Sequence, residues 1–176
     1  MASPAPVLHP LLQYSQHDIE LGHCSQLIWD LREPARNARH ALSPDRPLSD
    51  FELSQHATNP PVFLLRVTCG IFPEESWVSE ARNWLGVTVA DVLDSIAATM
   101  QTQITWAEWN KLCPKQQNRV NIVFDARWRR ASDGEQVRER GVLRSDCVLQ
   151  HILFAGLSVV LDADTTFFLT LRRPKR

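Results

Sequence analysis

The chain has 176 residues, a length typical of one domain, and 44% of them are hydrophobic and 22% charged. These fractions lie close to the globular average, which excludes a disordered chain, a collagen-like chain or a coiled coil as the main architecture. The 19 Lys and Arg residues nearly balance the 20 Asp and Glu residues, so no overall charge directs the protein toward nucleic acid or an anionic membrane.

The N-terminal segment lacks the features of a secretory signal. Pro4, Pro6 and Pro10 interrupt its only apolar run, and no stretch elsewhere approaches the ~20 apolar residues that span a bilayer. The four cysteines form no CxxC pair; they are Cys24, Cys69, Cys113 and Cys147. We therefore expect a soluble intracellular protein with reduced thiols and no membrane contact, located in the cytoplasm (a nuclear location is left open) and not secreted.

The composition along the chain divides it into three segments. Residues 1–25 are expected to form a loosely ordered arm, residues 26–171 a single globular domain, and residues 172–176 a basic tail. At the start of the domain, the apolar residues 26–31 predict a short strand. The proline-rich and arginine-rich residues that follow, 32–47, predict a solvated loop.

Two strands are predicted next. Residues 62–68 are rich in β-branched and apolar side chains, which favours a strand after the extended backbone imposed by Pro60 and Pro61. Residues 76–81 alternate between polar and apolar side chains, which is typical of a half-buried strand.

Three helices are predicted in the middle of the domain. Thr88 and Asp91 form an acidic variant of the capping box, in which each side chain bonds to the backbone N–H of the other residue. Thr105 and Glu108 form a second box, and Pro114 is well placed in the first turn of a third helix. The expected helices cover residues 88–100, a short segment from 105 to about 113, and 114 to about 130.

The last part of the domain is expected to be mostly extended. Residues 137–146 have an extended character, and residues 147–154 are ambiguous between a strand and a short helix. Gly156 is expected to break that segment, and residues 157–161 and 165–171 predict a terminal hairpin. The predicted fold class is therefore α+β: a mainly antiparallel sheet with about three helices, over 88–131, packed on one face.

No motif for a cofactor or a nucleophile is found. The chain has no GxGxxG, no phosphate-binding loop of the GxxxxGK[ST] type and no GxSxG elbow. His17, His23 and Cys24 are spaced like part of a zinc site, but a fourth ligand is missing nearby, so surface histidines are the favoured interpretation. We expect no cofactor and no bound metal.

The tryptophans and a basic segment are the other candidates for binding. Trp29 and Trp77 fall in strand-like runs and are expected in the core. Trp106 and Trp109 lie three residues apart on one helix face, which is either core, the favoured interpretation, or an exposed patch for a partner. A basic segment with one aromatic residue is compatible with nucleic-acid binding, although acidic neighbours favour a solvated surface. It contains Arg127, Trp128, Arg129, Arg130, Arg138, Arg140 and Arg144.

A series of spaced motifs resembles an uncharacterised domain-of-unknown-function family of mushroom-forming (basidiomycete) fungi. The motifs are Leu8-His9-Pro10-Leu11-Leu12, Ile28-Trp29-Asp30-Leu31, Ala57-Thr58-x-Pro60-Pro61, Trp77, Val87-Thr88-Val89-x-Asp91-Val92-Leu93, Arg127, Arg140-Gly141-Val142-x-Arg144-x-Asp146 and Phe154-x-Gly156-Leu157. One departure is Phe167-Phe168, where the family pattern has a Trp in the last strand. The resemblance implies a compact fungal domain and no particular activity.

The same resemblance implies a shared polar set of Asp30, Arg127, Arg144 and Asp146. The favoured interpretation is a buried Arg–Asp network that ties the sheet to the helices, because buried charges need partners. The alternative is a pocket for an anion or an acidic ligand.

Three functions remain open from the sequence. The favoured one is a non-catalytic binding or protein-interaction module, with an unknown protein partner or a second copy as its partner. The second is an enzyme with a cryptic pocket, of hydrolase or tailoring type. The third, and least favoured, is nucleic-acid binding through the basic segment at 127–144 and the basic C-terminal tail.

Overall fold

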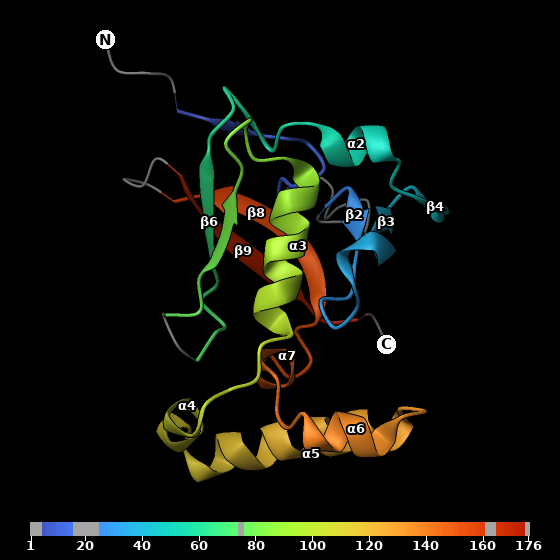
Figure 1. The fold of residues 1–176 in the computed structure, drawn as a ribbon, viewed down its shortest axis with the longest axis vertical. Helices are drawn as coiled ribbons and strands as arrows, with labels where there is room; N and C mark the ends of the chain where they lie inside the picture. Colours follow the sequence, from blue (N-terminus) through green and yellow to red (C-terminus); the bar gives the residue numbers. More distant parts are fainter. Residues whose placement is uncertain (1–4, 16–24, 74–75, 161–164, 175–176) are drawn as a thin grey trace.

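The computed structural model describes residues 5–15, 25–73, 76–160 and 165–174. His17, His23 and Cys24, the turn at 162–164 and the last two residues of the expected basic tail lie outside these ranges. The described part is a mixed α and β fold in which a central sheet and the helix Val89–Met100 form the core (Figure 1).

The central sheet has four strands in the order β7 (Ser79–Arg82), β6 (Leu64–Thr68), β9 (Thr166–Arg172) and β8 (Leu153–Val159). Strands β6 and β9 pair in parallel, and the other two pairings are antiparallel. The strands predicted over 62–68 and 76–81 and the antiparallel pairing at the C-terminus are therefore confirmed. Gly156 is an exception, because it lies within β8 instead of ending the preceding segment.

Two smaller sheets lie beside the central one. Strand β1 (Val7–Leu8) pairs with β5 (Thr58–Asn59), and β2 (Leu27–Ile28) begins a three-stranded sheet with β3 (Arg39–His40) and β4 (Ser43–Pro47). The prediction of a solvated loop over 32–47 is right about solvent exposure, since most of the segment is exposed, but wrong about the loop, since the segment holds β3, β4 and the short 3-10 helix η1 (Ala35–Asn37). Backbone pairing with β2 and burial of small alanines order a stretch whose prolines and charges suggested a loop.

The described part of the expected N-terminal arm packs into the core. Leu8, Leu11 and Leu12 are buried there, and the backbone of Tyr14 donates a 2.9 Å hydrogen bond to Leu157 in β8. Residues 5–15 thus cover one edge of the central sheet and belong to the globular domain instead of a loose arm.

Helix α3 (Val89–Met100) packs against the sheet (Figure 1). Its N-terminus has the predicted capping box, because the Thr88 side chain accepts from the Asp91 backbone and the Asp91 carboxylate accepts from the Thr88 backbone. Its apolar face is fully buried, as helical spacing predicts for Val89, Val92, Leu93, Ile96 and Met100. The short helix α2 (Asp50–Ser54) lies at the opposite end of the molecule from α5.

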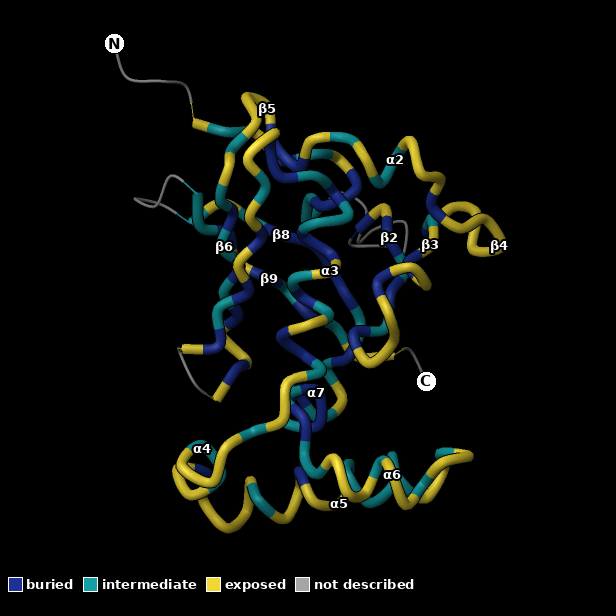
Figure 2. The backbone as a smooth tube through the Cα atoms, in the orientation of Figure 1, coloured by how far each residue is buried: buried dark blue, intermediate teal, exposed yellow. Residues whose placement is uncertain are grey.

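Helices α4 (Trp106–Lys111), α5 (Pro114–Arg130) and α6 (Gly134–Glu139) form a layer beyond the lower end of α3, and we call them the helical layer (Figure 1). The two helices predicted around 105–130 are confirmed, but they do not pack on the sheet face with α3. The reason is visible in Figure 2: α5 is mostly exposed or half-buried, and Val120 is its one buried residue. A helix with so narrow an apolar stripe does not cover a sheet.

The prediction of an extended segment over 137–146 is wrong. It contains the end of α6, a turn at Gly141 and the start of α7 (Arg144–Cys147), which lies between the helical layer and the sheet. The carboxylate of Asp146 accepts from the Leu143 backbone, which stabilises the first turn of α7.

Candidate ligand pocket

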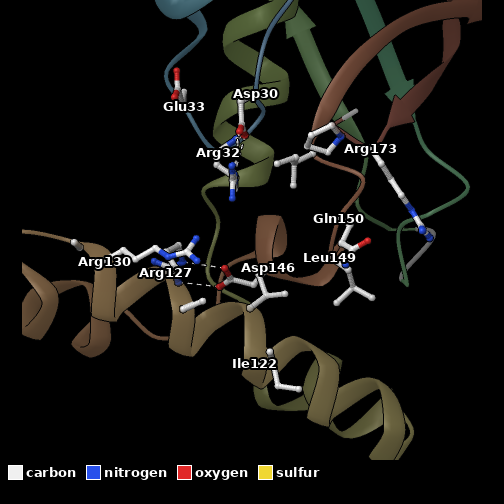
Figure 3. Close-up of a pocket in the computed structure, with 15 residues that line it drawn as sticks. Asp30, Arg32, Glu33, Ile122, Arg127, Arg130, Asp146, Leu149, Gln150 and Arg173 are labelled. Carbon is white, nitrogen blue, oxygen red and sulfur yellow. Dashed lines mark hydrogen bonds and ion pairs between the residues drawn. The ribbon is translucent and has the colours of Figure 1, made fainter. Parts of the chain in front are cut away.

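An open pocket of about 930 Å³ lies between α5, the α7–β8 connection and the loop after β2, and we call it the α5 pocket (Figure 3). Four guanidinium groups, three carboxylates and several apolar side chains line it. The lining residues are Asp30, Arg32, Glu33, Ile122, Val123, Ala126, Arg127, Arg130, Ala131, Asp146, Leu149, Gln150, Ile152, Arg173 and Pro174.

The inner wall of the pocket is an ion pair between Arg127 of α5 and Asp146 of α7. The guanidinium donates two hydrogen bonds of 2.8 Å, one to each carboxylate oxygen, and a third of 2.8 Å to the Gly141 carbonyl. Asp146 is only 1% exposed and also accepts from the Leu143 backbone at 2.9 Å. Paired, planar contacts of this kind hold both groups in one orientation, so this pair is a rigid part of the site.

Asp30 lies across the pocket from α5 and has a different partner. Arg32 donates to it from Nε at 2.9 Å and from Nη2 at 2.6 Å. The hydrogen bond to Asp30 raises the pKa of the Arg32 guanidinium, although partial burial opposes the effect. Asp30 and Asp146 therefore line the same pocket, and each is occupied by a separate arginine.

Arg144 is not among the residues that line the pocket. Its Nη2 lies 3.4 Å from the Glu108 carboxylate, and its guanidinium carbon lies 4.8 Å from the centre of the Trp77 ring. The Trp77 indole donates a 2.5 Å hydrogen bond to the same Glu108 oxygen. The polar set implied by the resemblance is thus divided: Asp30, Arg127 and Asp146 share the α5 pocket, and Arg144 belongs to a second cluster with Trp77 and Glu108.

This second cluster joins the helical layer to the sheet side of the molecule. Burial alone would raise the pKa of Glu108. Three hydrogen bonds, from the Thr105 backbone, the Trp77 indole and the Thr105 hydroxyl, and the charge of Arg144 lower it. Together they outweigh burial, so the pKa of Glu108 is below its usual value. Arg144 Nε is buried without a hydrogen-bond partner in the described structure. The cluster orders the chain around α4 and leaves no side chain directed into the pocket.

Two cations of the pocket have no carboxylate partner among the residues that the structure describes. Arg130 lies at the C-terminal end of α5, and Arg173 lies at the other side of the pocket after β9 (Figure 3). Arg173 Nε donates a 3.2 Å hydrogen bond to His151. Sequence reasoning placed these two arginines in a basic segment and a basic tail, and only their shared pocket identifies them as candidate binding residues.

The floor of the pocket is apolar. Ile122, Val123 and Ala126 come from α5, and Leu149 and Ile152 come from the α7–β8 connection. Ile122 is 61% exposed, Val123, Ala126 and Leu149 are half-buried, and Ile152 is buried, so this surface is partly open to solvent. The sequence contains no signal for this floor, because Leu149 and Ile152 belong to a segment without clear periodicity.

The predicted aromatic residues fall into two groups. Trp29 and Trp77 are buried, which confirms the prediction that they belong to the core. Trp106 is 80% exposed and Trp109 is half-buried, so the favoured core interpretation of this helix face is wrong for Trp106. No residue of α4 is buried.

The basic segment is largely engaged within the protein. The guanidinium carbons of Arg129 and Arg138 each lie 5.3 Å from the centre of the Trp128 ring, and the Trp128 indole donates to Asp125. Arg127 and Arg144 are held in the ion pairs described above. The one aromatic ring of the segment and most of its arginines therefore contact other groups of the protein, which leaves few of them free to bind a nucleic acid.

No group of three or more His, Cys, Asp or Glu side chains is placed to hold a metal ion within the described ranges. None of the helices described has both the length and the apolar character needed to cross a bilayer. Burial raises the pKa of the Cys69 thiol, and burial together with nearby carboxylates raises that of Cys147 to about 12.

Comparison with known proteins identifies the family. The family of unknown function DUF6699 matches residues 27–166. The chain belongs to this family. The match includes β6, β7 and β8 of the central sheet, all of the helical layer and most of the α5 pocket, but it stops at the first residue of β9 and excludes Arg173 and Pro174. No curated protein and no solved structure matches the chain.

Proposed function

We propose that this DUF6699 protein is a non-catalytic binding module that holds a carboxylate-bearing segment of a partner protein in the α5 pocket. The observation that carries the proposal is the placement of Arg130 and Arg173, two cations without a carboxylate partner in the described structure, beside a partly exposed apolar floor. An anionic group is attracted by the arginines, and an aliphatic side chain next to it is stabilised by burial on the floor.

The charge of the pocket favours a single carboxylate in the ligand. Arg32 and Arg127 already neutralise Asp30 and Asp146, and Glu33 accepts a 3.1 Å hydrogen bond from Asn37. Glu33 keeps its charge, so the four guanidinium groups and three carboxylates leave a net charge of about +1, and the cations without a carboxylate partner are Arg130 and Arg173. A modest, localised charge suits an acidic side chain in a peptide better than a polyanion such as nucleic acid.

The shape of the pocket favours a segment of a protein over an enclosed small molecule. Its volume of about 930 Å³ is at the upper end of the range for small-ligand sites, and it is open to solvent along α5. The alternative, an enzyme with a cryptic pocket, requires a titratable group free to act on a substrate. Asp30 and Asp146 are each paired with an arginine, which favours recognition over catalysis at these two carboxylates, and the third carboxylate, Glu33, accepts a hydrogen bond from the Asn37 amide.

The proposal is tested with a labelled probe peptide in which Glu and Leu alternate, and with a matched peptide in which Gln replaces Glu. Fluorescence anisotropy of the labelled peptides reports binding to the full chain. We expect the Glu peptide to bind and Arg130→Glu to weaken its binding by about tenfold or more. Arg129→Glu is the matched control, because Arg129 is the next residue on α5, does not line the pocket and pairs with Asp125.

Two outcomes would overturn the proposal. Equal binding of the Glu and Gln peptides would show that the arginines do not recognise the ligand. An equal loss in Arg129→Glu and Arg130→Glu would show that general charge, and not the pocket, attracts the peptide.

A further inference from the structure

The two edges of the central sheet differ in how they are covered. The edge strand β8 receives backbone hydrogen bonds from outside the sheet, for example from Leu157 to Leu12 and from Phe154 to Trp29. The opposite edge strand, β7, pairs with β6 alone among the described strands (Figure 1, the light-green strand beside β6). An uncovered edge strand is a template for pairing with another strand.

The register of β7 shows which residues face the open edge. Leu65 lies opposite Ala81, and the Asn83 backbone donates a 3.1 Å hydrogen bond to Phe63. In an antiparallel ladder hydrogen-bonded residues alternate along the strand, so Ala81 and Asn83 direct their backbone groups toward β6. Glu80 and Arg82 therefore direct their backbone N–H and C=O groups toward the open edge.

The side chains of these two residues are charged and exposed on the outer face of the sheet. Ser79 and Ala81 are buried on the inner face, whereas Glu80 and Arg82 are exposed. Arg82 donates a 2.6 Å hydrogen bond to Glu80, whose other oxygen accepts from Arg66 at 2.9 Å. Charges on an edge strand normally prevent pairing with other strands, but here two opposite charges flank Ala81 symmetrically.

We propose that a second copy of this chain pairs with β7 in antiparallel fashion, about a twofold axis at Ala81. In this register Glu80 of each copy lies opposite Arg82 of the other, so the charges attract across the interface. The same residues carry the outward backbone groups, so each Glu80–Arg82 pair also exchanges both of its backbone hydrogen bonds. The two central sheets then form one continuous sheet.

An apolar cluster beside β7 adds to this interface. Trp84 is 81% exposed, Phe63 is 67% exposed, and Leu85 is also exposed. Trp84 and Leu85 lie in the turn directly after β7, where the Gly86 backbone donates a 3.0 Å hydrogen bond to the Asn83 carbonyl, so they flank the end of the proposed interface. Burial of large aromatic side chains dominates the energetics of many interfaces, so Trp84 supplies the apolar area that the charged pairs lack.

Charge reversal gives a sharp test, since each variant alone is mismatched and the two variants together are complementary. Glu80→Arg places two guanidinium groups opposite each other across the axis, and Arg82→Glu places two carboxylates there. We expect the unaltered chain to form a dimer in sedimentation equilibrium, each single variant to be monomeric, and an equal mixture of the two variants to form a mixed dimer.

Controls separate a changed interface from a changed fold. Arg119→Glu and Glu135→Arg make the same charge changes on exposed parts of α5 and α6 and should leave the dimer intact. The single variants should keep the circular dichroism spectrum of the unaltered chain. The milder variant Glu80→Gln should weaken association by about tenfold and should also keep this spectrum. A monomeric unaltered chain, dimers that survive both reversals, or a mixture that stays monomeric would each overturn the proposal.

Discussion

Arg127 donates two parallel hydrogen bonds, each 2.8 Å long, to the two carboxylate oxygens of Asp146. The pair joins α5, a largely exposed helix, to the buried first turn of α7. Because α5 has only Val120 buried, this ion pair is a major contact that holds the helical layer against the rest of the protein. It also forms the inner wall of the α5 pocket, so the stability and the shape of the site depend on the same two residues.

Arg127→Ala should destabilise the protein by about 3–5 kcal/mol, because it leaves the buried carboxylate of Asp146 without its charged partner. Chemical denaturation measures the change in the free energy of unfolding. Arg127→Lys keeps the charge but not the paired geometry and should lose less. Arg129→Ala, on the exposed side of α5, should stay within about 0.5 kcal/mol. A loss under about 1 kcal/mol in Arg127→Ala would contradict the structural role of the pair.

The Glu108 cluster should make stability depend on acid pH. The pKa of Glu108 is lower in the folded protein than the value of about 4.3 expected in the unfolded chain. Its contribution to stability is therefore present above that unfolded value and is lost as the pH falls through the folded pKa. Measured against the unaltered chain, Glu108→Gln should lose stability at neutral pH, and the difference should shrink in acid. A difference that stays constant with pH would count against this assignment.

Gly156→Ala should lower the free energy of unfolding by about 1–3 kcal/mol or more. Gly156 has a φ of 121°, and a Cβ placed on it would lie 2.5 Å from the Cα and N atoms of Tyr14. These are backbone atoms, so the N-terminal segment would have to move away from β8. Thermal unfolding of the variant and of Gly70→Ala, where the nearest neighbour is the tip of the Phe168 ring, gives the comparison. Similar stabilities for the two variants would contradict the predicted clash between a Cβ at position 156 and the backbone of Tyr14.

Trp77 and Trp106 should respond very differently to truncation. Trp77 is buried and bonded to Glu108, so Trp77→Ala should cost about 3–5 kcal/mol of unfolding free energy. Trp106 is mostly exposed to solvent, so Trp106→Ala should change the free energy of unfolding by about 0.5 kcal/mol or less. Denaturant titrations of the two variants measure both values. A large loss in Trp106→Ala would show that α4 depends on this ring.

Local signals in the sequence predicted the helices best. The boxes at Thr88 and Thr105 and the proline at position 114 mark real helix starts, because their hydrogen bonds and backbone angles act within one turn. The same signal is present at Ser49 and Glu52, where α2 begins, but the surrounding prolines and charges concealed it. Short helices such as α6 and α7 carry too few apolar residues to show a period.

The candidate site was only partly predictable. The set implied by the family resemblance brings Asp30, Arg127 and Asp146 to one pocket, but the partner of each charge is decided by packing. Arg144 pairs with Glu108, a residue that the sequence identified only as part of a capping box. Arg130 and Arg173 lie 43 positions apart in the sequence numbering, and only the fold places them around one apolar floor.

Methyl NMR of isotope-labelled isoleucines tests the central claim most directly, since Ile122 and Ile152 line the α5 pocket while Ile71 and Ile96 lie elsewhere in the chain. We predict that unlabelled Glu–Leu peptide shifts the methyl signals of Ile122 and Ile152 and leaves those of Ile71 and Ile96 in place, and that Arg130→Glu abolishes these shifts. Peptide binding that leaves Ile122 and Ile152 unchanged would contradict the pocket as the binding site.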